Sequence, residues 1–220
     1  MRYLSLLLLF LSAFLTSSFH SDPLPEEVEK LSLYDENIII QGPEFLKGGT
    51  SWADSVFKQM SLEEKIGQLF NVAAYSNKGE DHKKEIAELI EKYHIGGLTF
   101  FQGRHTAQVA LTNYYQSISA VPLMVAMDAE WGPSMRIDST IVYPWQMTLG
   151  AIQDEQLLYQ MGADIAEQLR RLGVHVNFAP VVDVNNNAAN PVIGYRSWSE
   201  NRENVTEKSY QYMKGMQDAG

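Results

Sequence analysis

The sequence predicts an α/β fold built on a parallel sheet, and two observations support this prediction. Short apolar segments alternate along the chain with longer segments whose apolar residues recur at helical spacing. The short segments are apolar almost throughout, which is typical of strands that are buried on both faces of a parallel sheet. No cysteine is present, so neither disulfides nor thiolate metal sites are expected to hold the fold together.

The first eighteen residues have the layout of a secretory signal. Arg2 supplies a positive charge, residues 4–15 are almost entirely apolar, and small polar residues follow at 16–18. The apolar run is too short to span a bilayer comfortably, although an uncleaved membrane anchor is the alternative. We therefore expect residues 1–18 to be a signal peptide, residues 19–51 to be a leader, and the protein to be exported, to the periplasm or beyond.

Composition limits the partners of the protein. The chain carries a formal charge of −10, with 45% hydrophobic and 20% charged residues. These values fit one globular domain with a substantial core, and 220 residues suit one domain. The negative charge argues against nucleic acid and, after signal cleavage, against membrane surfaces as partners. The five histidines lack the spacing of a metal site, so no metal or cofactor is expected.

From residue 52 onward, helix and strand signals alternate. A short amphipathic helix is expected at 52–60, and the next helix begins with a capping box formed by Ser61 and Glu64. In the segment 155–172 the apolar residues recur at helical spacing, and Gly173 follows as a stop signal. Strands are expected at 67–74, 97–101, 122–127 and 174–178, and the longer helices at 83–93, 106–117, 155–172 and 203–218.

The last expected strand leads into the most informative loop of the chain. Val174, Val176 and Phe178 form the strand, which breaks at Ala179-Pro180 into a polar segment rich in asparagine. A long loop that follows a buried strand is where α/β proteins place their binding and catalytic residues. An ordinary surface loop is the alternative.

Four strand–helix units fit either a doubly wound sheet or a (β/α)₈ barrel. A doubly wound nucleotide-binding protein is expected to have a glycine-rich turn after its first strand. The turn at residues 75–79 has the single glycine Gly79, and no phosphate-binding glycine motif occurs elsewhere. The pattern therefore disfavours a nucleotide-dependent protein but does not by itself choose the barrel.

Six stretches of the sequence together resemble the N-terminal domain of glycoside hydrolase family 3, above all its β-N-acetylglucosaminidase branch. In chain order they are EEKIGQLF, IGGLTFFQG, LTNYYQ, PLMVAMDAEWG, PWQMTLGA and NFAPVVDVNNNAANPVIGYRSWSEN. The resemblance covers roughly residues 52–220 and implies a (β/α)₈ TIM-type barrel. Because such a barrel typically needs about 250 residues, we expect 52–220 to supply roughly its first half, with further domains in a longer protein.

Asp128 and Arg196 are the expected substrate-binding residues. Asp128 directly follows the expected strand 122–127, at the edge where barrel enzymes place functional side chains. The resemblance implies that its carboxylate binds hydroxyls of the sugar at the cleavage point, whereas capping of a turn is the structural alternative. It also implies that Arg196 contacts the sugar, and the alternative is a salt bridge to Asp183 or Glu200.

Four further residues are expected to support this site. Glu130 is expected to be a structural acceptor rather than a catalytic partner of Asp128, because in the family neither catalytic group comes from this segment. Asp183 and the asparagines 185–187 are expected to shape their loop through side-chain-to-backbone bonds. Arg136 matches a family arginine. Trp131 departs from the family, in which many members have glycines here, and both sugar stacking and core packing are open to it.

The resemblance implies the reaction. It is a two-step retaining hydrolysis of terminal β-linked N-acetylhexosamine residues, from glycans such as cell-wall fragments, without metal or cofactor. In the family a flexible loop supplies a His–Asp acid/base pair and a later strand supplies an aspartate nucleophile, and both are expected beyond residue 220. We therefore expect residues 1–220 alone to be inactive. A β-glucosidase of the same family and a non-catalytic carbohydrate-binding domain are the alternatives.

Overall fold

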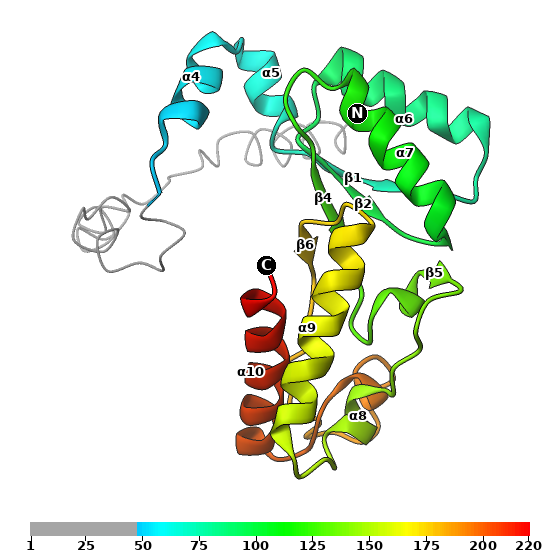
Figure 1. Cartoon of the computed structure of the whole chain (residues 1–220), viewed down its shortest axis with the longest axis vertical. Coiled ribbons are helices and arrows are strands. Elements are labelled where there is room, and N and C mark those ends of the chain that lie inside the picture. The colour runs from blue at the N-terminus through cyan, green and yellow to red at the C-terminus, as the bar shows by residue number, and fades with distance from the viewer. Residues whose placement is uncertain (1–47) are drawn as a thin grey trace, which may run out of the picture. The chain divides into compact units, whose positions relative to one another are not determined.

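The computed structural model describes residues 48–220 (Figure 1). The expected signal peptide and all but the last residues of the expected leader lie outside the described residues. The chain divides into two compact units, residues 1–56 and 57–220. Helix α4 (Ser51–Gln59) agrees with the helix expected at 52–60, and near its start the Thr50 hydroxyl donates a hydrogen bond to Asp54 at 2.9 Å.

A four-stranded parallel sheet forms the centre of the second unit. Its strands are β1 (Asn71–Ala74), β2 (Gly97–Phe100), β4 (Met124–Met127) and β6 (Val176–Asn177), in that spatial order. Each strand pairs with the next one along the chain, and the winding never reverses. A doubly wound sheet reverses its strand order, whereas a barrel does not. The observed order is therefore that of a barrel, and it confirms the expected parallel sheet.

All four strands are shorter than the sequence pattern predicts, β1 and β6 by the most residues. Strand β1 begins at Asn71 rather than at residue 67, because Gly67 ends helix α5 (Leu62–Gly67). At Gly67 an added Cβ would lie 2.0 Å from the carbonyl oxygen of Tyr93, so the helix end packs directly on the chain beyond it. Strand β6 has only two residues, although the backbone N–H of Phe178 continues the ladder by donating to Met127 at 2.9 Å.

The longer helices lie where they were expected, and polar caps begin two of them as well as the short helix α5. The Ser61 and Glu64 capping box is present at α5, with the Ser61 N–H donating to the Glu64 carboxylate at 2.7 Å and the Glu64 N–H donating to the Ser61 hydroxyl at 3.2 Å. Asp154 and Asn201 cap the last two helices. The long helices are α6 (Glu80–Tyr93), α7 (His105–Ile118), α9 (Glu155–Arg171) and α10 (Arg202–Asp218). In the described part of the chain, none has both the length and the apolar character needed to cross a bilayer.

Helices α9 and α10 pack side by side, as Figure 1 shows, and glycines permit their close approach. A Cβ added at Gly162 would lie 2.1 Å from the Tyr212 carbonyl oxygen, and one at Gly215 would lie 1.9 Å from that of Tyr159. The core around the two helices includes the fully buried side chains of Trp198 and Tyr212.

Short elements in the connecting loops were not expected from the sequence. Strand β3 (Gly103–Arg104) pairs in parallel with β5 (Ile137–Asp138), and the backbone N–H of Gly103 donates to Arg136 at 3.1 Å. The remaining short elements are the 3₁₀ turns η2 (Pro133–Met135) and η3 (Gly194–Arg196) and the helix α8 (Gln146–Leu149). They tie together the loops that follow β2, β4 and β6.

Candidate active site

The candidate site lies where the parallel strands end. Tyr75 directly follows β1, Phe101 follows β2, Asp128 follows β4 and Phe178 follows β6. Because the strands are parallel, these residues meet at one edge of the sheet, the edge at which barrel enzymes carry their functional side chains.

Asp128 is held by Arg136 and still faces solvent in part. The Arg136 Nη2 donates to the Asp128 carboxylate at 3.1 Å, and its Nε donates to the Asp128 backbone carbonyl at the same distance. Arg136 therefore fixes both the side chain and the main chain of Asp128. About a third of the Asp128 side chain, 32%, remains exposed. A carboxylate offers about four acceptor positions, so Asp128 retains capacity for further donors such as sugar hydroxyls.

A series of ring contacts supports Arg136 from the neighbouring strand ends. The Arg136 guanidinium lies 4.8 Å from the centre of the Phe101 ring, and this ring stacks on Tyr75 with the centroids 5.6 Å apart. Lys78 Nζ lies 3.5 Å from the centre of the Tyr75 ring. Cation–π contacts of this kind favour a guanidinium over a more strongly hydrated cation. The residues after β1 and β2 thus help to position the Asp128–Arg136 pair after β4.

Arg196 forms a bidentate ion pair with the buried carboxylate of Glu130. Its Nη2 and Nε donate to the two carboxylate oxygens at 2.7 and 2.9 Å, and Nη1 donates to the Val192 carbonyl at 3.3 Å. The Glu130 side chain is 5% exposed and that of Arg196 33%. The hydrogen bonds to Glu130 raise the pKa of Arg196 above its usual value. The salt bridge considered from the sequence, to Asp183 or Glu200, is therefore wrong, because the partner is Glu130.

The geometry also limits what Arg196 can offer a ligand. The flat edge formed by Nε and Nη2 faces Glu130, so the guanidinium cannot present that fork to a sugar while the pair is intact. Its remaining N–H groups lie on Nη1 and on the outer side of Nη2. Glu130, in turn, is an acceptor inside the protein with its charge already compensated.

Asn177 is a positioning residue that the sequence reasoning missed. From strand β6 its side-chain amide accepts a hydrogen bond from the Ala129 N–H at 2.9 Å and donates to the Ala129 carbonyl at 3.2 Å. The buried Tyr212 hydroxyl also donates to that carbonyl, at 3.3 Å. Burial raises the pKa of Tyr212, so this hydroxyl keeps its proton as a donor. These bonds fix the residue between Asp128 and Glu130. The only sequence signal is an amide between the apolar residues Val176 and Phe178 of the expected strand.

The loop after β6 is held by its own polar groups. The buried Ser197 hydroxyl donates to the Asp183 backbone carbonyl at 2.6 Å, and the Trp198 indole donates to the Val181 carbonyl at 2.9 Å. The Asn187 side chain accepts from the Ala189 N–H at 3.0 Å, which is the kind of bond expected for the run 185–187. Asp183 itself is exposed, and its negative charge contributes to the raised pKa of Arg196.

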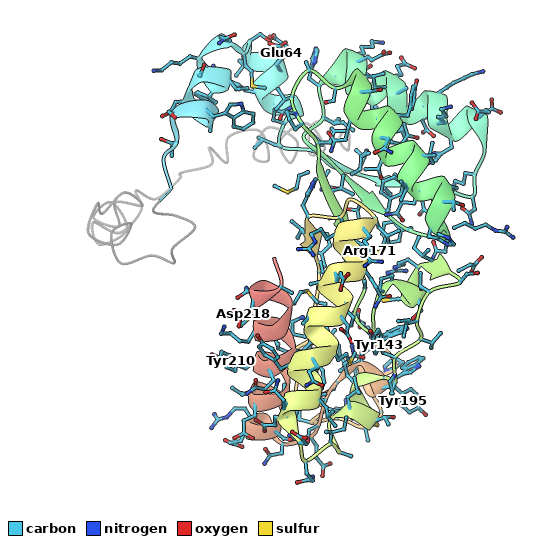
Figure 2. The ribbon with its side chains drawn as sticks, viewed as in Figure 1. Glu64, Tyr143, Arg171, Tyr195, Tyr210 and Asp218 are labelled. Carbon is cyan, nitrogen blue, oxygen red and sulfur yellow. The ribbon has the colours of Figure 1, made fainter. Side chains whose placement is uncertain are left out.

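Trp131 packs against other aromatic residues at the surface. Its ring stacks on Trp145 with the centroids 4.8 Å apart and the planes 9° from parallel. Tyr195, which Figure 2 labels near α8, lies in η3, and η3 contacts α8. Its ring stands edge-on to that of Trp145, with the centroids 5.5 Å apart. Among the residues that the structure describes, no group of three potential metal-ligating side chains occurs.

Comparisons with known proteins agree on one family. The family model of the glycosyl hydrolase family 3 N-terminal domain matches residues 61–220. A beta-hexosaminidase A from Pseudoalteromonas piscicida is 39% identical over an alignment of 149 residues, and the match covers 62% of this chain and 25% of that protein. The solved structure of a family 3 β-N-acetylglucosaminidase from Paenibacillus sp. str. FPU-7 is 34% identical with a TM-score of 0.65, covering 73% of this chain and 31% of the other.

A third relative carries a sugar analogue. The structure of NagZ from Neisseria gonorrhoeae in complex with N-trifluoroacetyl-D-glucosamine is 26% identical, with a TM-score of 0.57, and the likeness covers 68% of this chain and 47% of that one. The chain thus spans between about a quarter and a half of the length of these three relatives. The matches confirm the α/β, TIM-type fold that the sequence predicted.

Proposed function

Because the chain belongs to glycosyl hydrolase family 3, whose N-terminal domain its residues 61–220 match, we propose a function for the whole protein. It hydrolyses terminal β-linked N-acetylhexosamine residues, above all GlcNAc. The observation that carries this proposal is the carboxylate of Asp128, which Arg136 orients at the end of β4 while a third of it stays exposed. The names of two relatives, beta-hexosaminidase and β-N-acetylglucosaminidase, support the choice of sugar. A β-linked GlcNAc glycan or a cell-wall fragment is the proposed substrate.

In this proposal Asp128 accepts hydrogen bonds from the hydroxyls of the bound sugar. Charge-assisted hydrogen bonds are shorter and stronger than neutral ones, so a fixed carboxylate at this edge favours a polyhydroxylated ligand. Arg196 contributes through the N–H groups that Glu130 leaves unused. Arg136 and Asn177 act through Asp128 and Ala129, as positioning residues.

The proposed reaction proceeds in two steps with retention at the anomeric carbon. A carboxylate attacks that carbon while an acid protonates the leaving oxygen, and water then hydrolyses the covalent glycosyl-enzyme. The family resemblance assigns both groups to positions beyond residue 220. Glu130 does not suit the role of the acid, because its carboxylate is buried and paired with Arg196.

Export of the protein is a further part of the proposal. It rests on the charge and apolar pattern of residues 1–18. The test is the N-terminal sequence of the mature protein recovered from the periplasm or medium, which should begin close after residue 18.

The proposed site is tested by sugar binding. GlcNAc is titrated calorimetrically into the protein produced from its complete gene and into its Asp128→Ala variant. We expect the substitution to weaken binding at least tenfold, about the effect of losing one or two hydrogen bonds to a charged group. Asp164→Ala removes an exposed carboxylate of α9 and serves as the matched control. Equal affinity in wild type and Asp128→Ala would remove Asp128 from the site.

Hydrolysis assays distinguish the proposed activity from a β-glucosidase and from a non-catalytic carbohydrate-binding protein. Hydrolysis of an aryl β-N-acetylglucosaminide in preference to an aryl β-glucoside is the expected result. The reverse preference would identify a β-glucosidase, and binding of GlcNAc without cleavage of either substrate would identify a non-catalytic carbohydrate-binding protein.

A further inference from the structure

We propose that Trp131, Trp145 and Tyr195 form an aromatic platform that binds a second sugar ring, the one on the leaving-group side of the sugar held at Asp128. This inference rests on the proposed function, because it names the neighbouring subsite of the same site. Trp131 stands where many family members have glycine, so the family resemblance does not supply such a subsite.

The platform offers exposed aromatic surface. Trp131 and Trp145 are stacked almost in parallel, with the centroids 4.8 Å apart, and Tyr195 meets Trp145 at 88°. Trp145 is 46% exposed and Tyr195 67%. A contiguous exposed apolar patch, unlike single exposed apolar side chains, often marks a site for a ligand or a partner.

The chain neighbours of the three rings connect the platform to the Glu130–Arg196 ion pair. Trp131 follows Glu130, and Tyr195 precedes Arg196, the two partners of the buried ion pair. Trp145 precedes Gln146, whose fully buried side chain donates to the Glu130 backbone carbonyl at 2.7 Å. Each ring is therefore one residue away from a group that is hydrogen-bonded at Glu130. A site built on such fixed groups binds with little loss of conformational entropy.

The surroundings select a sugar over a purely apolar partner. Asp128 and Arg196 each keep about a third of their side chains exposed. Along the chain, Asp128 lies three residues before Trp131, and Arg196 directly follows Tyr195. Asp128 and Arg196 already have ion-pair partners, but an apolar protein surface on the platform would remove the exposed parts of both side chains from water without new hydrogen bonds, at considerable cost. A pyranose ring has an apolar C–H face for the aromatic surface and a rim of hydroxyls for the charged groups. The combination of aromatic walls with a few fixed polar groups is typical of small-ligand sites.

The test compares one sugar with two. GlcNAc and the sulfur-linked, non-hydrolysable analogue of the β-linked GlcNAc disaccharide are titrated calorimetrically into the protein produced from its complete gene. The wild type should bind the disaccharide about tenfold more tightly, the effect of one aromatic stacking contact. Trp145→Leu should remove this advantage and leave the affinity for GlcNAc within about twofold. Trp145→Tyr retains a flat ring and should keep most of the advantage.

Controls separate the subsite from folding and from the proposed function. Trp52→Ala removes another exposed tryptophan, in α4, and should change neither affinity. If Trp145→Leu does not fold, Tyr195→Leu tests the same expectation from the exposed loop. GlcNAc binding that depends on Asp128, together with a disaccharide advantage that Trp145→Leu and Tyr195→Leu leave intact, would overturn the platform alone. Absence of binding by either sugar in the wild type would overturn the proposed function and the platform with it.

Discussion

At the scale of single residues, the candidate site depends on two arginine–carboxylate pairs that differ in burial. In the Asp128–Arg136 pair the carboxylate keeps about a third of its surface exposed, whereas in the Glu130–Arg196 pair the carboxylate is buried. The first pair can exchange solvent for a ligand, and the second is part of the interior. The two pairs therefore predict different consequences of substitution, one for binding and the other for stability.

Replacement of Arg136 by lysine should weaken sugar binding without unfolding the protein. Lysine keeps the positive charge but loses the planar fork that bonds both the carboxylate and the backbone carbonyl of Asp128, and it stacks less well on Phe101. We expect about a tenfold lower affinity for GlcNAc and a change in stability below about 1 kcal/mol. Calorimetric titration and urea unfolding measure the two quantities. Arg171→Lys, in an exposed pair with Glu167, is the control and should alter neither.

Replacement of Glu130 by alanine should instead lower the free energy of unfolding of the protein. The substitution leaves the Arg196 guanidinium without the carboxylate that accepts from its Nε and Nη2. Removing one partner of a buried pair costs about 3–5 kcal/mol, and Arg196 is a third exposed, so the lower end of that range is expected. Urea unfolding measures the loss. Glu167→Ala breaks an exposed pair and should cost no more than about 1 kcal/mol, so an equal loss in both variants would contradict the prediction.

At the scale of secondary-structure elements, the sequence pattern was sufficient for the long helices and for the succession of strands along the chain, but not for the spatial order of the strands in the sheet. The capping box of Ser61 and Glu64 and the stop signal at Gly173 are local patterns, and both are present in the structure. Strand ends were less predictable, because the apolar residues before Asn71 suit a helix end as well as a strand. Elements of two to four residues have too little periodicity to be recognised.

The site residues also divide into those that a local pattern predicts and those that depend on tertiary contacts. Asp128 could be placed from the sequence because it follows an apolar strand, whereas the pairing of Glu130 with Arg196 joins residues 66 positions apart. The Asn177 amide that holds Ala129 and the Trp145 ring that stacks on Trp131 likewise depend on tertiary contacts. Single-sequence patterns report local structure, and they do not report which distant loops meet.

The close packing of α9 and α10 leads to a prediction about Gly215. In an open helix, replacing glycine by alanine stabilises by about 1 kcal/mol. Here a Cβ would lie 1.9 Å from the Tyr159 carbonyl oxygen, which is backbone and cannot rotate away. Gly215→Ala should therefore force the helices apart and cost about 1–3 kcal/mol, the usual range for overpacking. Gly49→Ala, where an added Cβ meets nothing within 4 Å, is the control. Urea unfolding measures the change in stability. A Gly215→Ala variant more stable than the wild type would contradict the predicted overpacking.

At the scale of the whole molecule, both edges of the four-stranded sheet and an apolar groove beside one of them are uncovered within the described residues. Strands β1 and β6 lie at the two ends of the four-stranded sheet, and each pairs there on one side only. Beside β1, a groove of about 530 Å³ is lined by side chains that are mostly apolar, among them Ile66, Phe70, Val72 and Leu89. Free strand edges next to exposed apolar surface favour association between copies of a chain.

Residues 48–220 expressed by themselves should therefore self-associate. Phe70 is 57% exposed at the groove, and burying it against a second copy would remove a large aromatic surface from water. Size-exclusion chromatography with light scattering should show dimers or larger species whose fraction rises with concentration. Phe70→Ser should lower that fraction, whereas Tyr210→Ser, which removes an aromatic ring 51% exposed on α10, should leave it unchanged. A single monomeric species at every concentration would show that neither the groove nor the sheet edges drive association. Equal reduction by both substitutions would point to general surface hydrophobicity instead of the groove beside β1.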